Sequence, residues 1–263
     1  MVISHKHHYV FVELGHTGST AISQELCELY GGGTILHKHA TYGDLLRVAS
    51  LEEKSYFVLS CIRNPLDNAV TSYFKSRNDH QQTYSSVRER PWFTRLFYQN
   101  RTKSFEFIRK YDADFSTYFL KFYRFPYDNW SALSHHQFDY VIRFEKLEEG
   151  FSQVLKMIGV EQIRPLPIIH RTGERQRDFH LYYKPETVQR AKHVFGPFMK
   201  KWGYEFPPEW GADSVSWMSR FQFSVLGLFR RFYWIYLRSI IYARLFYERG
   251  DHSTAEKIRE TIR

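Results

Sequence analysis

The turn Gly15–Thr20, with the sequence GHTGST, combines residue types that hold anions. It follows the apolar run 9–14 without a spacer and leads into residues 20–30, whose apolar spacing is that of a helix. At such a turn backbone N–H groups converge, and the helix dipole adds partial positive charge. The triphosphatase loop has a longer spacing and a lysine where this turn has His16, and we find no second-strand aspartate for magnesium. We therefore expect the turn to hold a phosphate group that needs no metal.

A second turn that can hold an anion follows the predicted strand 56–62. Arg63 leaves the end of this strand, and Thr71 follows two helical turns later. A guanidinium group can bind a phosphate group through two parallel hydrogen bonds. Because the carboxyl ends of parallel strands share one edge of a sheet, both turns should open at that edge. Two separate phosphate-binding turns suit a nucleotide that is phosphorylated at both ends of its ribose.

Two histidines, His37 and His39, supply the residue type that general base catalysis needs. They are two positions apart at the end of the predicted strand 34–37, so they should point to one side of it. A histidine of near-neutral pKa can take the proton of an attacking hydroxyl. We expect His39 to be the base and His37 to support it. The alternative is a pair of solvated histidines, since the chain has 13, and a metal site is disfavoured because spacing places no third ligand.

The elements that must position these residues alternate between strand and helix. Short apolar runs predict strands at 9–14, 34–37, 56–62 and 138–145, and helical spacing predicts helices at 20–30, 41–50, 65–77, 147–159 and from 185 onward. The alternation favours an α/β fold with a central parallel sheet covered by helices on both faces. Residues 80–137 are aromatic and basic and show no clear element boundary.

Four segments in order resemble the sulfotransferase family. HTGST after the first strand and RNPLDNAVTSY after a later one resemble its two nucleotide signatures, with the family's interval of eight positions between Arg63 and Thr71, where Ser is usual. VIRFEKLEEGFSQVLKMIGV resembles the family's Arg-x-Glu-x-Leu segment, and GPFMKKWGYEFP resembles its usual ending. The resemblance covers about residues 8–208. It implies a P-loop-like three-layer fold, to which the chain adds a C-terminal helical tail.

The resemblance also implies a donor, 3′-phosphoadenylyl sulfate, and its product, adenosine 3′,5′-bisphosphate. The first loop would hold the 5′-phosphosulfate, through residues His16, Thr17, Gly18, Ser19 and Thr20. Arg63 and Thr71 would hold the 3′-phosphate. The His-x-His segment resembles that of carbohydrate sulfotransferases such as heparan sulfate 2-O-sulfotransferase, in which the second histidine is the base. The acceptor would then be a hydroxyl of a carbohydrate or glycolipid.

His16 is where the chain departs from this family, which usually has Lys and sometimes Arg there. A histidine can donate one hydrogen bond to the leaving oxygen and carries positive charge only when protonated, so we expect a pH-dependent assistance. Two interpretations stay open: an enzyme that transfers sulfate without a metal, and a weak or inactive relative that binds the bisphosphate or an acidic glycan. The basic segment 161–184 would either close over the 3′-phosphate or an acidic acceptor, or be a solvated loop. Its arginines are Arg164, Arg171, Arg175 and Arg177.

Charge and composition limit the partners and the compartment. The chain has 263 residues and a formal net charge of +9, which favours a nucleotide, an acidic glycan or an anionic membrane surface, with nucleic acid the least favoured. Cys27 and Cys61 fall in predicted regular elements, so we expect reduced thiols and no disulfide. The N-terminal residues enter a strand almost at once and leave no room for a signal peptide, so we expect a cytoplasmic protein.

We expect a sulfotransferase-like α/β domain over residues 1–210 and a basic, aromatic helical tail over residues 211–263. Arginines interrupt the apolar residues of 214–247, and no run reaches the roughly 20 residues that span a bilayer. The tail would pack on the domain or on a partner subunit in a homo-oligomer, or lie peripherally on a membrane as an interfacial helix.

Overall fold

The computed structural model describes residues 1–36, 38–86, 92–129, 135–169, 176, 178–211, 214–233 and 237, without the side chains of 92–98. The chain divides into two compact units. The first contains the described residues of 1–63, 129–170 and 228–263, and the second contains those of 64–128 and 171–227. Each unit has a hydrophobic core of its own. The division of the chain at residue 210 stays a prediction.

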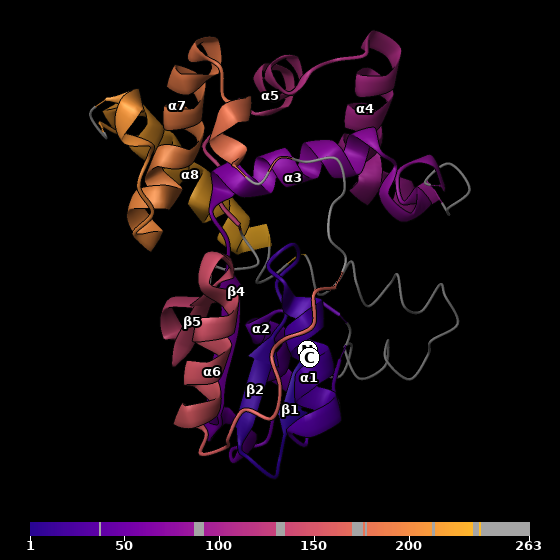
Figure 1. Ribbon diagram of the computed structural model, residues 1–263, viewed down its shortest axis with the longest axis vertical. Coiled ribbons are helices and arrows are strands. Elements are labelled where there is room, and N and C mark those ends of the chain that lie inside the picture. The colour runs from indigo at the N-terminus through magenta and orange to yellow at the C-terminus, as the bar shows by residue number, and fades with distance from the viewer. Residues whose placement is uncertain are drawn as a thin grey trace. The chain divides into compact units, whose positions relative to one another are not determined.

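The first unit is built on a five-stranded sheet (Figure 1). Its strands are β1 (Val2–Ser4), β2 (Tyr9–Val12), β3 (Gly33–Thr34), β4 (Phe57–Ile62) and β5 (Tyr140–Arg143), in the order β3-β1-β2-β4-β5. β2, β4 and β5 are parallel, as predicted, but β1 is antiparallel to both β2 and β3. The prediction of a wholly parallel sheet is therefore wrong, and the sheet is mixed.

A local hairpin causes this difference. Ser4 pairs with Tyr9 across a four-residue turn, so β1 takes the place beside β2. A tight hairpin is the shortest connection between two strands, and it leaves the predicted strand 34–37 only the outer edge of the sheet. There the strand is reduced to Gly33–Thr34, with Thr34 opposite Val2.

Helices cover both faces of the sheet in the first unit, which confirms the α/β class. On one face α1 (Ser19–Leu29) and α6 (Leu147–Met157) bury apolar side chains against Tyr9, Phe11, Leu59 and Ile142. On the other face α2 (Tyr42–Val48) packs its Leu45 against Val10, Val12 and Val58. Thr41 is the N-cap of α2, as predicted, and forms a capping box with Asp44.

The second unit is helical and contains α3 (Pro65–Arg77), α4 (Trp92–Tyr111), α5 (Phe115–Phe122) and α7 (Pro185–Trp202) (Figure 1). It also contains α8 (Trp217–Phe232) up to Gly227, and the residues of α8 from Leu228 on belong to the first unit. The core of the second unit is an aromatic cluster from α3, α5 and α7, with Phe119 and Phe195 fully buried. The helices predicted at 65–77 and from 185 are confirmed. α8 lies in the predicted tail, of which residues 211, 214–233 and 237 are described. Among the described helices, none combines the length and apolarity that crossing a membrane requires.

Candidate functional site

The turn between β2 and α1 requires glycine at its last residue. Gly18 has a φ of 75° and is the N-cap of α1. A Cβ atom there would be 2.7 Å from Cδ2 of Leu147 and 3.3 Å from Cδ2 of Phe144. The left-handed backbone angle therefore disfavours a residue with a Cβ atom, and an added Cβ would also displace the end of the Leu147 side chain. His16 is also left-handed, with a φ of 67°. Left-handed residues in a short loop are typical of the backbone concavities that bind anions.

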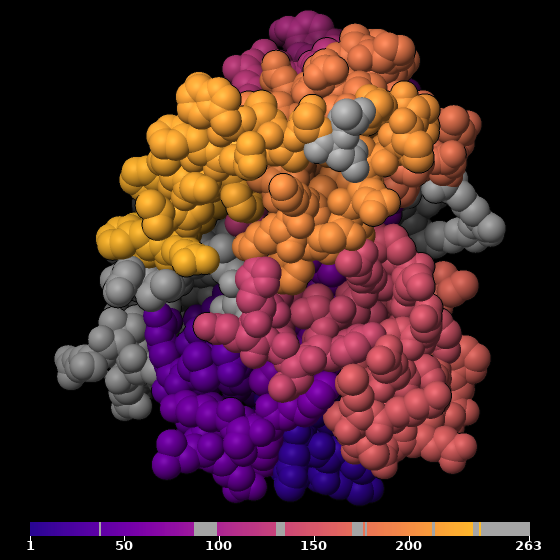
Figure 2. All heavy atoms as spheres, turned by 90° about the vertical axis from the view of Figure 1, so that its left-hand side faces the viewer, coloured from indigo at the N-terminus to yellow at the C-terminus, as the bar shows by residue number. Residues whose placement is uncertain are grey.

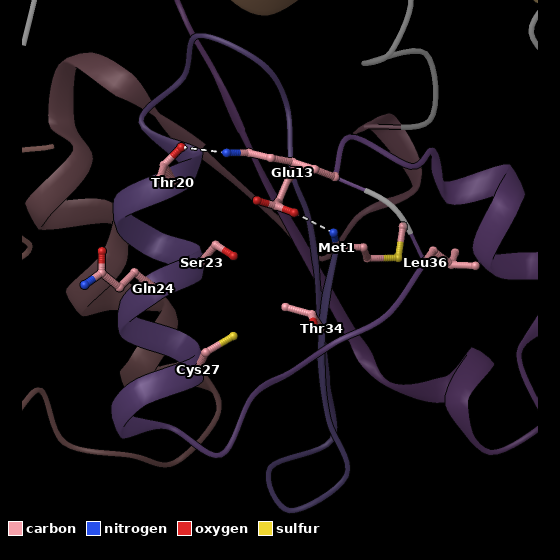
Figure 3. A pocket seen from close by; sticks show the side chains of 9 residues that line it. Met1, Glu13, Thr20, Ser23, Gln24, Cys27, Thr34 and Leu36 are labelled. Atoms are coloured by element: carbon pink, nitrogen blue, oxygen red, sulfur yellow. Dashed lines mark hydrogen bonds and ion pairs between the residues drawn. The ribbon is translucent and has the colours of Figure 1, made fainter. Parts of the chain in front are cut away.

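The three hydroxyl residues of this loop differ in what they present to a ligand. Thr17 is 2% exposed and donates a hydrogen bond of 2.7 Å to the Leu14 carbonyl, so its hydroxyl braces the loop. Ser19 is 3% exposed at the first position of α1. Thr20 is half-buried and lines a pocket (Figure 3). Thr17 and Ser19 can serve a ligand through their backbone N–H groups, whereas Thr20 also presents its hydroxyl.

Arg63 joins the end of β4 to the same loop. Its Nη1 donates a hydrogen bond of 2.9 Å to the His16 carbonyl, and its Cζ lies 4.0 Å from the centre of the Phe144 ring. The stacking and the hydrogen bond fix the guanidinium beside the loop. β2 and β4 are parallel neighbours, so Arg63 and the loop lie at the same sheet edge, as expected. A guanidinium has five N–H donors, so contact with a phosphate is compatible with this bond.

His39 lies beside the beginning of the loop. Its Cε1 and Nε2 are each 3.9 Å from the position that a Cβ atom would take on Gly15, and its Nδ1 is 3.2 Å from the Glu13 carbonyl oxygen. A carbonyl oxygen only accepts hydrogen bonds, so Nδ1 carries the proton in the neutral ring and Nε2 keeps its lone pair. This is the tautomer that a general base acting through Nε2 needs.

The surroundings of His39 favour its neutral form as well. The residue is exposed overall, but its Nδ1 edge faces the protein, and the loss of water there lowers the pKa of the ring below its ordinary value. The hydrogen bond to the Glu13 carbonyl opposes this shift and raises the pKa, while the charge of Lys38 lowers it further. The net effect keeps the ring neutral at pH 7, ready to accept a proton.

Lys38 provides a positive charge at this loop, and the sequence motifs did not indicate it. Its side chain is exposed and reaches α1, where Nζ donates a hydrogen bond of 3.2 Å to Oγ1 of Thr20. The loop lacks a lysine of its own, but a lysine ammonium group thus lies at the first turn of the following helix. The sequence does hold a signal for this position of Lys38. The residue stands between His37 and His39, which were predicted to supply and support the base, so it must lie close to them.

A pocket of about 320 Å³ opens beside α1 next to this lysine (Figure 3). Thr20, Ser23 and Gln24 line it from α1, and Glu13 and Thr34 line it from the sheet side. Hydroxyl, amide, carboxylate and ammonium groups together can both donate to and accept from a ligand rich in hydroxyl groups.

Four further residues were predicted to bind the ligand or support the base: Thr71, His37, Arg171 and Arg164. Thr71 belongs to α3 in the second unit, and its side chain is 2% exposed. His37 and Arg171 lie outside the described residues. Arg164 forms ion pairs of 2.8 Å and 2.6 Å with Glu25 and Glu28 of α1. These carboxylates balance its charge, which favours a structural role for this arginine over a contact with phosphate.

Comparisons with protein-family models, with curated proteins and with solved structures found no match to this chain. Cys27 and Cys61 are free thiols, as predicted. Within the described part of the chain, no three His, Cys, Asp or Glu side chains come together as ligands of one metal ion. A functional assignment therefore rests on the loop, on His39 and Lys38, and on the sequence resemblance.

Proposed function

We propose that this protein is a sulfotransferase with a P-loop-like fold, which moves a sulfuryl group from 3′-phosphoadenylyl sulfate to a hydroxyl of a carbohydrate or glycolipid. The observation that carries the proposal is the position of His39. A histidine whose Nε2 keeps its lone pair lies against Gly15, at the beginning of a loop that has the geometry of an anion site. The basic charge of the chain and its order of motifs support the same function.

In the proposed reaction the acceptor oxygen attacks the sulfur in line with the leaving group. The hydroxyl proton passes to Nε2 of His39 as the new O–S bond forms. The bond between sulfur and the oxygen of the 5′-phosphate breaks, and adenosine 3′,5′-bisphosphate leaves with the electron pair. Negative charge grows on that oxygen, so a cation beside it lowers the barrier.

We assign this cation to Lys38 together with His16. The ammonium group of a lysine stays charged throughout the neutral pH range, whereas a histidine is largely uncharged above its pKa. The hydrogen bond of 3.2 Å from Lys38 to Thr20 supports the assignment, because it holds the charge at the loop. In this scheme the backbone of Thr17–Ser19 holds the 5′-phosphosulfate, and Arg63 braces the loop while it contacts phosphate.

Two measurements on His39→Ala test the role of the base. Calorimetry with adenosine 3′,5′-bisphosphate measures binding, and labelled donor with a panel of glycans and glycolipids measures transfer. We expect the variant to keep its affinity for the bisphosphate and to lose transfer by about 10²-fold or more, since a general base contributes that much. The control is His7→Ala, a half-buried histidine of the same unit. Equal transfer by both variants would exclude His39 as the base.

A second function, binding without transfer, is favoured by His16, which stands where the family has lysine. Such a protein would hold the bisphosphate or an acidic glycan. The bisphosphate would stabilise such a protein, as it would stabilise the enzyme, but the protein would transfer no labelled sulfuryl group to any acceptor. A cytoplasmic location also stays a prediction.

A further inference from the structure

A basic pocket lies within the second unit, beside α5 and α7. Its volume is about 530 Å³, and the described residues that line it are Leu120, Arg124, Arg190 and His193. Leu120 lies in the last turn of α5, and Arg124 follows that helix. Arg190 and His193 are three positions apart on α7, which places them on one side of it. No carboxylate is among these lining residues, so the pocket has a positive charge that none of them balances.

The backbone at the end of α5 orients both guanidinium groups. Nε of Arg124 donates a hydrogen bond of 3.0 Å to the Lys121 carbonyl, and Nη1 of Arg190 donates one of 3.2 Å to the Tyr123 carbonyl. Each bond uses one of the five N–H donors of a guanidinium group. Neither arginine has another hydrogen bond or an ion pair with a described residue, so the remaining donors can serve a ligand.

Packing between α5 and α7 holds the two sides of the pocket in place. The Phe119 ring of α5 has its centre 5.7 Å from that of Phe195 on α7, and both side chains are fully buried. The amide of Tyr127 donates a hydrogen bond of 2.8 Å to the Val194 carbonyl, which joins the chain after α5 to α7. The cationic groups are therefore positioned before a ligand binds, and this lowers the entropic cost of binding.

The pocket is open to solvent. Arg124 is exposed, and Arg190 and His193 are half-buried. Nε2 of His193 is 3.1 Å from Oε1 of Gln222 on α8, a contact that orients the imidazole ring. Figure 2 shows residues of α7 and α8, in orange tones, at the molecular surface. A ligand can therefore reach the cationic groups from solvent.

We propose that this pocket binds a sulfate or phosphate monoester. Two guanidinium groups can share the oxygen atoms of one tetrahedral anion, because each of them can donate two parallel hydrogen bonds. Such an anion also balances positive charges that lie together without a carboxylate. The volume is in the range of sites for small organic molecules, and Leu120 offers an apolar contact to the organic part of the ester. The inference concerns the second unit alone and does not depend on the proposed sulfotransfer.

Calorimetry of the full chain with glucose 6-sulfate, glucose 6-phosphate and uncharged glucose tests this inference. We expect binding of the esters and none of glucose, and the tighter ester shows whether the pocket prefers sulfate or phosphate. Arg124→Gln and Arg190→Gln should each weaken binding about 10-fold or more, since a hydrogen bond to a charged group contributes about that much. Arg190→Lys should recover only part of the loss, because it keeps the charge but cannot donate two parallel hydrogen bonds.

A second set of variants changes the charge without replacing an arginine of the pocket. Leu120→Glu would supply a carboxylate to the pocket and should abolish binding, whereas Leu120→Gln has nearly the same shape, no charge, and should bind. Equal binding by these two variants would contradict the inference. Lys103→Gln with Arg109→Gln removes two exposed cations of α4 that do not line the pocket, and should bind like the parent. Circular dichroism should show that all variants stay folded.

The loop of the first unit could bind the same esters, and the variants separate the two sites. A loss of binding in Lys38→Gln, with none in Arg124→Gln and Arg190→Gln, would place the esters at the loop and overturn the inference. Equal affinities of the pocket variants and the α4 control, or no binding of either ester to the parent, would overturn it as well. Inorganic sulfate that binds as tightly as glucose 6-sulfate would exclude the contact assigned to Leu120.

Discussion

The replacement Lys38→Gln removes the cation that we assign to the leaving group and leaves a neutral polar side chain that is one atom shorter. Lys38 Nζ is 3.2 Å from Thr20 Oγ1 at the loop. We take about 4 Å as the order of the distance between this charge and a ligand oxygen. Two unit charges at about 4 Å attract with about 1 kcal/mol in water and about 4 kcal/mol at an effective dielectric constant of 20. Because Lys38 is exposed, the loss should be about 1–2 kcal/mol, or roughly 5- to 30-fold in kcat/KM for the donor.

The assay is a transfer measurement with labelled donor across a range of pH. Parent protein should keep its activity above the pH at which an ordinary histidine loses its charge, at about pH 6.5. In Lys38→Gln the rate should fall as the pH rises through that range, because His16 is then the remaining cation at the leaving oxygen. Lys38→Arg should restore part of the rate at alkaline pH, and Lys54→Gln, an exposed lysine of the same unit, should have no effect. Unchanged kcat/KM and an unchanged pH profile in Lys38→Gln would refute the assignment.

Three further predictions concern the structure around the loop. Gly18→Ala should lower the free energy of unfolding by about 2–5 kcal/mol, of which about 1–2 comes from the left-handed backbone and about 1–3 from the overlap with α6. Gly15→Ala, where the added Cβ would make ordinary contacts, should lower it by less than about 1 kcal/mol. Equal urea midpoints for the two variants would contradict this prediction. His39 has a lower pKa in the folded chain than in the unfolded chain, so on acidification the unfolded chain binds this proton at a higher pH. The free energy of unfolding should therefore fall as the pH drops below about 6.5, and urea titrations of His39→Gln should show a smaller fall. Arg164→Ala should lower the thermal midpoint, because Glu25, whose side chain is fully buried, loses its cation; an unchanged midpoint would show that the ion pair adds nothing.

Local patterns made the loop and its flanking elements predictable. The apolar run before Gly15 and the helical spacing after it define a strand, a turn and a helix, and Gly18 fits the turn because it has no Cβ atom. Pro65 similarly marks the first residue of α3. These features depend on residues that are close in the sequence, so they could be read without the structure.

Tertiary contacts determined what the sequence pattern missed. β1 has three residues, too few to show periodicity, and its hairpin with β2 decides the sheet order. The hydroxyl of Thr17 points into the protein because the Leu14 carbonyl lies there, which spacing cannot show. Lys38 reaches Thr20 only because the chain after β3 returns to α1. Residue spacing places Lys38 near the predicted base His39, but it does not indicate the contact with Thr20, which is 18 positions away in the sequence.

The most direct measurement of the central claim is the transfer of a labelled sulfuryl group from 3′-phosphoadenylyl sulfate to carbohydrate and glycolipid acceptors, with parent protein and His39→Ala side by side. We predict labelled acceptor with the parent, little or none with the variant, and the same affinity of both for adenosine 3′,5′-bisphosphate. The account is contradicted if both proteins label the acceptor equally, or if the parent neither binds the bisphosphate nor transfers the label.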